Sequence, residues 1–254
     1  MAPEGPATAE LAARNIAALK LATAEALGHA RLAEPGLVAT DAAGPFRGHN
    51  VAIALRPAPA ERLAGRAERF FTARAGGPWS LQDYWGVGDL RPLGYELGIV
   101  MPVLRRPPAP PPAAGPPGLE VRRVAGAEPL WWFERTLIDG FPFADLRPPR
   151  RGALFDERVL DVTGLHLWVG LLDGAPAATA MAFVAGGSVG VYWVATLPGA
   201  RGRGLGGALT RTALAVAPEL PAVLSATPAG VPVYRRLGFR PEARTWWWWS
   251  RSRG

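Results

Sequence analysis

The sequence predicts an α/β protein of the α+β type, with a mixed sheet, built from two parts. In the second half, antiparallel strands come first and alternating strands and helices come last, which is typical of a mixed sheet rather than a doubly wound one. Between the halves, seven prolines crowd into residues 105–118, and such a segment cannot enter the interior of a sheet. We therefore expect domains over 1–105 and 119–254, joined by a Pro-rich linker over 106–118.

In the first half, apolar spacing predicts two helices, and strand-like runs predict three strands. The expected helices span 8–27 and 60–74, and the expected strands span 51–55, 81–85 and 96–104. No polar cluster in this half points to a reaction.

In the second half, Asp173-Gly174 is a strong hairpin turn, and Pro218 ends the helix that begins at Leu205. The expected strands span 119–124, 166–172, 178–184, 188–197, 222–226 and 244–250. The other expected helices are 130–138 and one that ends at Leu237.

The composition excludes several classes of protein. The chain has no Cys, which excludes disulfides, a thiol nucleophile and thiolate metal sites. Its three His residues are scattered, so we expect no metal. Residues 1–10 do not resemble a signal peptide, and no apolar run approaches the roughly 20 residues of a membrane span. We therefore expect a cytoplasmic protein without a membrane partner.

The net charge of +7 comes almost entirely from Arg. These Arg residues are scattered through the chain, which favours biased residue usage over a nucleic-acid surface. A small polyanionic ligand would also suit this charge.

The most informative stretch is the Gly-rich segment Arg201-Gly202-Arg203-Gly204-Leu205-Gly206-Gly207, which follows a strand and opens a helix. A helix N-terminus offers unpaired N–H groups and the positive end of the helix dipole. Glycines let those groups touch a phosphate directly, and the two Arg add charge-assisted contacts. The segment therefore predicts a pyrophosphate cradle.

Two common cradles do not match. The P-loop needs a Lys and a Ser or Thr after its last Gly, and neither is present. The dinucleotide fingerprint is matched by Gly202, Gly204 and Gly207, but that fingerprint lies tight against an early strand of a parallel domain. Here three residues separate the strand from the loop, and too little chain follows.

Arg201 to Gly206 instead match the R-x-x-G-x-G signature of the GNAT acyl-CoA N-acyltransferases. About 30 residues later, the run from Tyr234 to Phe239 resembles the Y-x-x-x-G-F segment of that family. The resemblance covers the second half well. The first half resembles a degenerate GNAT copy, as in tandem members, and has no R-x-x-G-x-G of its own.

The resemblance implies that acetyl-CoA lies between two splayed strands, with its pantetheine arm paired to strand backbone and its pyrophosphate on the loop amides. The implied acetyl-CoA-binding residues are Val194, Ala195, Thr196, Arg201, Gly202, Arg203, Gly204, Leu205, Gly206 and Thr227. Thr227 stands where many members have Asn.

The resemblance also implies direct attack of the amine on the thioester. The N–H of Val194 would stabilise the oxyanion, and Tyr234 would protonate the leaving thiolate. Gly190 stands where histone-modifying relatives have Glu. The general base therefore stays open, with a water chain as one alternative.

Other polar residues favour structural roles. We expect Glu134, Asp139 and Asp145 on solvated surfaces, and His166 in a structural position. In the run Trp246–Trp249, alternate side chains face opposite sides of a strand. One pair would fill the core, and the other would pack on the first half, on a partner subunit of a homodimer, or on an aromatic substrate. We expect the two halves not to function apart.

These patterns predict an N-acetyltransferase that moves an acetyl group from acetyl-CoA to a primary amine of a small molecule or peptide, with one acetyl-CoA site per chain. The alternative is a non-catalytic CoA-sensing or regulatory module. A nucleic-acid binder would rest on charge alone.

Overall fold

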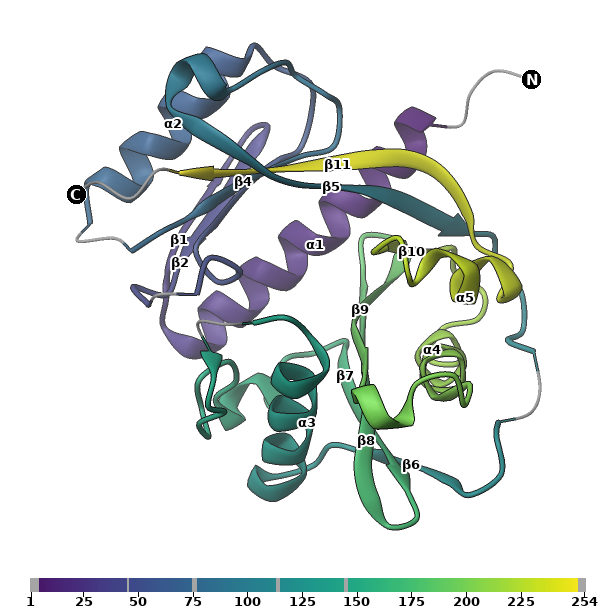
Figure 1. The fold of residues 1–254 in the computed structure, drawn as a ribbon. Helices are drawn as coiled ribbons and strands as arrows, with labels where there is room; N and C mark the ends of the chain where they lie inside the picture. The colour runs from purple at the N-terminus through teal and green to yellow at the C-terminus, as the bar shows by residue number, and fades with distance from the viewer. Residues whose placement is uncertain (1–4, 45, 75–76, 113–114, 144–145, 251–254) are drawn as a thin grey trace. The chain divides into compact units, whose positions relative to one another are not determined.

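The computed structural model describes residues 5–44, 46–74, 77–112, 115–143 and 146–250. The chain forms two compact units. Unit 1 comprises the described residues of 1–105, 225–229 and 241–250, and unit 2 comprises those of 106–224 and 230–240. Each unit has its own helices packed on strands (Figure 1).

Unit 1 contains six strands in the order β1-β2-β3-β4-β11-β5. Its helices are α1 (Gly5–Leu27), α2 (Ala60–Thr72) and the short 3-10 helix η1 (Arg91–Leu93). Its strands are β1 (Ala30–Glu34), β2 (Leu37–Asp41), β3 (Val51–Ala54), β4 (Ser80–Asp83), β5 (Tyr95–Arg106) and β11 (Arg240–Ser250).

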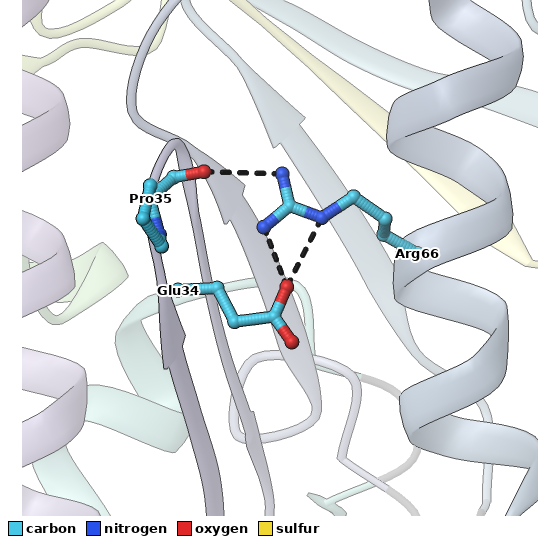
Figure 2. A network of polar contacts seen from close by, with 3 residues as sticks. All are labelled: Glu34, Pro35 and Arg66. Atoms are coloured by element: carbon cyan, nitrogen blue, oxygen red, sulfur yellow. Dashed lines mark hydrogen bonds and ion pairs between the residues drawn. The ribbon is translucent and has the colours of Figure 1, made fainter.

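Helix α2 buries one face because its apolar residues recur at helical spacing. Leu63, Ala67 and Phe70 lie on that face and join the core of unit 1. On the same helix, the Arg66 guanidinium donates to the Glu34 carboxylate at 2.6 Å and to the Pro35 carbonyl at 3.2 Å (Figure 2). This polar contact ties α2 to the turn between β1 and β2.

Unit 2 contains five strands in the order β10-β9-β8-β7-β6. They are β6 (Leu119–Arg123), β7 (Leu165–Leu172), β8 (Ala175–Ala185), β9 (Ser188–Thr196) and β10 (Ala222–Ser225). Its helices are α3 (Ala127–Gly140), α4 (Leu205–Leu214) and α5 (Val231–Arg236), with the 3-10 helices η3 (Glu157–Asp161) and η4 (Pro198–Ala200). Helices α3 and α4 lie on opposite sides of β7–β9 (Figure 1).

The Pro-rich linker begins at a buried arginine. The Arg106 guanidinium donates to the carbonyls of Ala109 and Pro110 at 2.8 and 2.9 Å, and to that of Leu237 at 2.8 Å. Proline offers no N–H but keeps its carbonyl as an acceptor. One side chain thus holds the start of the linker against the segment after α5.

Most predicted elements are confirmed to within a few residues, including the hairpin at Asp173-Gly174. The hairpin of β1 and β2 was missed, because its two five-residue strands gave no clear alternation. The structure also differs from the expected domain over 119–254, because β11 pairs with β4 and lies in unit 1.

One alternate pair of the Trp run packs in the first half, as one of the expected placements had it. Trp248 is buried in the core of unit 1 beside α2, and Trp246 packs against the same cluster. Trp249 is 37% exposed. Strand β11 lies in unit 1 from residue 241 onwards.

Unit 1 also holds a hollow of about 530 Å³ with a mixed lining that includes three aromatic side chains. Its aromatic lining residues are Tyr84, Trp85 and Trp246. The buried Asp83 carboxylate accepts from the amides of Trp85 and Val87, both at 2.8 Å. This carboxylate thereby shapes the loop that forms one wall.

No helix within the described residues is long and apolar enough to cross a membrane. Within the same residues, no three His, Asp or Glu side chains gather into a group that could hold a metal ion. The cytoplasmic location stays a prediction.

We expect Trp248→Ala to lower the free energy of unfolding by about 3–5 kcal/mol, because it leaves a cavity in the core of unit 1. The neighbouring Trp249→Ala is the matched control and should cost clearly less, since that side chain is 37% exposed and lies outside the core cluster. Urea denaturation of the full chain measures both, and equal losses would contradict the placement of Trp248.

Candidate active site

A β-bulge distorts strand β9 in its second half. Thr179 of β8 pairs with Ala195 and Met181 pairs with Tyr192, so two residues of β9 stand opposite one residue of β8. Trp193 lies in the bulge with φ of 50°, which is rare for a bulky side chain. The Thr179 hydroxyl donates to the Trp193 carbonyl at 2.8 Å. Strained backbone of this kind is kept where the surrounding structure holds it, often at functional sites.

Beyond the bulge, β9 separates from β10. The two strands pair in parallel at Val189–Ala222 and Gly190–Val223. Further along, the Leu197 amide donates to Ala177 on the β8 side at 2.9 Å. Because backbone groups alternate along a strand, those of Val194 and Thr196 point to the opposite edge. This edge can pair with an extended ligand.

The Gly-rich loop ends at the N-terminus of α4. Gly202 and Gly204 have φ of 79° and 80°, and a Cβ built at either would meet no atom within 4 Å. The first amide of α4 with a helical partner is that of Ala208, which donates to Gly204 at 3.1 Å. The amides of Leu205, Gly206 and Gly207 therefore stand free of intrahelical bonds. Glycines and open space leave these groups accessible, and the phosphate cradle stays a prediction.

The two sides of β9 present different groups. A Cβ on Gly206 would lie 3.5 Å from Thr196 Oγ1 and 3.7 Å from Val194 Cγ1, so these two side chains face α4. A Cβ on Gly140 would lie 3.0 Å from Ala195 Cβ, so Ala195 faces α3. The side chains of Val194 and Thr196 therefore lie on the same side of β9 as the glycine-lined N-terminus of α4.

The Arg201 side chain is exposed, and its guanidinium bonds to two backbone carbonyls. It donates to the Thr196 carbonyl at 3.2 Å and to the Gly140 carbonyl at 2.9 Å. The expected charge-assisted contact with a phosphate stays a prediction. The side chain joins the end of β9 to the end of α3, while Arg203 is exposed in the loop.

Tyr234 lies on α5, next to the first turn of α4. A Cβ on Gly207 would lie 3.7 Å from Val233 Cγ1, so α5 packs beside the cradle. The Tyr234 ring packs edge-on against Phe239, with centroids 5.9 Å apart. Burial raises the pKa of Tyr234 to about 12, which keeps the phenol protonated and able to donate.

The other predicted residues lie in different surroundings. Thr227 is exposed in the segment 225–229 of unit 1. His166 stacks on Trp168 of the same strand, with centroids 5.8 Å apart. Asp145 lies outside the described residues.

Glu134 corrects one expectation, because it is not solvated. It is buried at 1% exposure, and its carboxylate accepts from the amides of Gly152 at 2.8 Å and Leu154 at 2.5 Å. Asp139 pairs with Arg135 at 3.7 Å. Neither is placed as a general base.

An aromatic group beside the bulge was not predicted from the sequence. Phe141 and Phe143 follow α3, and both rings pack edge-on against Trp193. Their spacing gave no periodic signal, because they lie in a loop. The signal available in the sequence was Trp193, an aromatic residue directly before Val194, the expected oxyanion residue.

Unit 1 lacks a matching cradle in its described residues. Strands β3 and β4 pair at three successive positions, from Val51–Ser80 to Ile53–Gln82. The loop before α2 contains Pro57 and Pro59 and no glycine. Proline has no N–H to offer a phosphate.

A strand edge beside a glycine-lined helix N-terminus has the geometry that suits an extended ligand carrying phosphates. Residues 129–239 match the model of the acetyltransferase (GNAT) family. Residues 129–239 therefore belong to the GNAT acetyltransferase family. The sequence matches no curated protein.

Solved structures share the fold along most of the chain. A GCN5-related N-acetyltransferase from Kribbella flavida is 22% identical with a TM-score of 0.67, over 94% of this chain and 95% of the other. A GCN5-related N-acetyltransferase from Sphaerobacter thermophilus is 18% identical with a TM-score of 0.53, over 95% and 93%. A tandem GNAT protein from the clavulanic acid biosynthesis pathway is 14% identical with a TM-score of 0.55, over 93% and 94%. These likenesses concern the fold.

We expect Gly204→Val to weaken acetyl-CoA binding by at least about tenfold, because the new side chain enters the open cradle and hydrogen bonds to charged groups are lost. Calorimetric titration of the full chain measures the affinity.

Gly187→Val is the control for the effect of backbone strain. Gly187 has φ of 74°, also with nothing within 4 Å of its Cβ position, and lies in the turn between β8 and β9 at the other end of the strand. It should bind acetyl-CoA as the unmodified chain does. Equal affinity in both variants would show that the cradle lies elsewhere.

Proposed function

We propose that unit 2 transfers an acetyl group from acetyl-CoA to a primary amine of a small molecule or peptide. The observation that carries the proposal is the edge of β9 at Val194 and Thr196, which lies beside the amides of α4 and where Arg201 holds the Thr196 carbonyl. A pantetheine arm would pair with that edge as an added strand, and the pyrophosphate would bind the amides of Leu205, Gly206 and Gly207. The family membership supports the same choice of ligand.

The reaction needs no nucleophile from the protein. The amine nitrogen attacks the thioester carbon, a C–N bond forms, and the C–S bond breaks with its electron pair left on sulfur. The N–H of Val194, at the edge that faces the ligand, would donate to the oxyanion as charge develops. The nitrogen releases its proton to water, so the products are the amide and the free thiol of CoA.

Tyr234 would give the thiolate its proton. Loss of CoA as a bare thiolate is costly where water is excluded, and a positioned acid removes that cost. With its pKa raised to about 12 by burial, the phenol stays protonated throughout the neutral range. Its proton is replaced from solvent after each turnover.

We expect one acetyl-CoA site per chain, because the described part of unit 1 offers paired strands and a proline-containing loop in place of a cradle. Calorimetric titration of the full chain should saturate at one ligand per chain. Two equivalent sites would refute the assignment of binding to unit 2 alone.

We expect Tyr234→Phe to lower kcat by at least about tenfold, because general acid catalysis contributes about 10² to 10⁴ in rate and water can replace part of it. Affinity for acetyl-CoA should barely change, since the ring remains. Thiol release with an accepted amine measures kcat, and the matched control Tyr95→Phe removes a phenol oxygen from unit 1. An equal fall in affinity would make Tyr234 a binding residue.

The pH profile gives a second readout of the same role. An acid acts only below its pKa, so kcat of the unmodified chain should not decline through pH 10, the ordinary pKa of a phenol. The raised pKa moves that decline towards pH 12. A fall in kcat centred near pH 10 would contradict Tyr234 as the buried acid, and binding of acetyl-CoA without turnover of any amine would favour a CoA-sensing module.

A further inference from the structure

Three aromatic rings meet where α3 ends beside the bulge of β9. We call Phe141, Phe143 and Trp193 the aromatic triad. The two Phe rings stack with centroids 5.3 Å apart, and they lie edge-on to Trp193 at 6.3 and 6.0 Å. All three side chains are partly exposed, so each keeps surface for another ring.

The aromatic triad lies on the side of β9 away from the cradle. Val194 and Thr196 face Gly206 of α4, whereas Ala195 faces Gly140 of α3. Trp193 contacts the loop directly after α3, and α3 and α4 lie on opposite sides of these strands (Figure 1). A thioester held at the edge near Val194 would therefore be open to attack from the side of the aromatic triad.

Two arginines hold this loop in place. The Arg147 guanidinium donates to the carbonyls of Ile138, Asp139 and Phe141 at 3.3, 3.1 and 3.3 Å. Arg201 donates to the Gly140 carbonyl at 2.9 Å. The end of α3 is thus anchored by charge-assisted bonds. Because Trp193 is held in the bulge, the rings are positioned before a ligand arrives.

The carboxylates of α3 are used elsewhere. Both Glu134 oxygens accept from backbone amides, those of Gly152, Leu154 and Phe155. Asp139 pairs with Arg135. Among the described residues of α3 and its following loop, the groups beside Trp193 are therefore aromatic rather than acidic. Such a surface suits a ring better than a polycation.

We propose that the acceptor is a primary amine that carries an aromatic ring, and that the aromatic triad receives this ring. The proposal rests on the function proposed above and names its substrate class. Aromatic rings prefer stacked or edge-on neighbours with centroids 4.5–7 Å apart. The aromatic triad offers both geometries beside the residue whose amide would bind the oxyanion.

Three amines of differing side chain test the proposal on the full chain. We expect kcat/KM to be about two- to tenfold higher for 2-phenylethylamine than for 2-cyclohexylethylamine, which matches it in size but is not aromatic. It should exceed that for 1,4-diaminobutane by at least about tenfold, since that amine has no apolar group of this size. Equal values for the three amines, or a preference for the diamine, would overturn the proposal while leaving acetyl transfer intact.

A substitution in the aromatic triad locates the preference. Phe143→Leu should lower kcat/KM for 2-phenylethylamine by about two- to tenfold and leave that for 1,4-diaminobutane unchanged. Trp131→Leu is the matched control, because Trp131 is a partly exposed aromatic on α3 that contacts Arg151 instead. A preference for the ring that survives Phe143→Leu and Phe141→Leu would place the ring elsewhere.

A binding measurement separates this proposal from the function on which it rests. Calorimetric titration of 2-phenylethylamine into the chain saturated with CoA needs no turnover. Binding that weakens in Phe143→Leu but not in Trp131→Leu supports the aromatic triad, even if no amine is acetylated and the proposed function fails. No binding of 2-phenylethylamine, with 1,4-diaminobutane acetylated, overturns the aromatic triad alone.

Discussion

The positive φ of Trp193 is the constraint on which the site depends. The bulge adds one residue to β9, and the added residue changes which backbone groups reach β8 and which reach the free edge. Without this added residue, the backbone groups of Val194 and Thr196 would point towards β8. The same conformation brings the Trp193 ring to Phe141 and Phe143. One strained residue thus positions both the edge of β9 at Val194 and Thr196 and the aromatic triad. Backbone strain of this kind is often retained at functional sites.

Arg201 shows how a motif residue can also connect two elements of the fold. Its guanidinium joins the carbonyls of Thr196 and Gly140, and so holds the end of β9 against the end of α3. The glycines after it need freedom from side chains, whereas the arginine needs length and several donors. The R-x-x-G-x-G pattern therefore combines a joint between two elements with a cradle of amides.

The last strand of the chain makes the stability of unit 1 depend on the whole sequence. Strand β11 pairs with β4 and contributes Trp248 to the core around α2. A segment that stops at residue 105 would lack both the paired strand and this side chain. Its sheet would expose apolar surface and unpaired backbone groups, which favours aggregation. Unit 1 begins the chain but is completed only by its last strand, β11.

Features that depend on local pattern could be predicted from the sequence alone: nearly all helices and strands, the hairpin at Asp173-Gly174, and the glycine-lined start of α4. These features follow from turn chemistry and periodicity within a few residues. The remaining features became visible only in the folded chain. Three such features join segments that are distant along the chain. Strand β11 pairs with β4, the Glu134 carboxylate accepts from the Gly152 amide, and the Phe141 ring packs against Trp193. Periodicity reports which face of a strand is apolar but not which strand lies beside it, because pairing and packing are settled by contacts between distant residues.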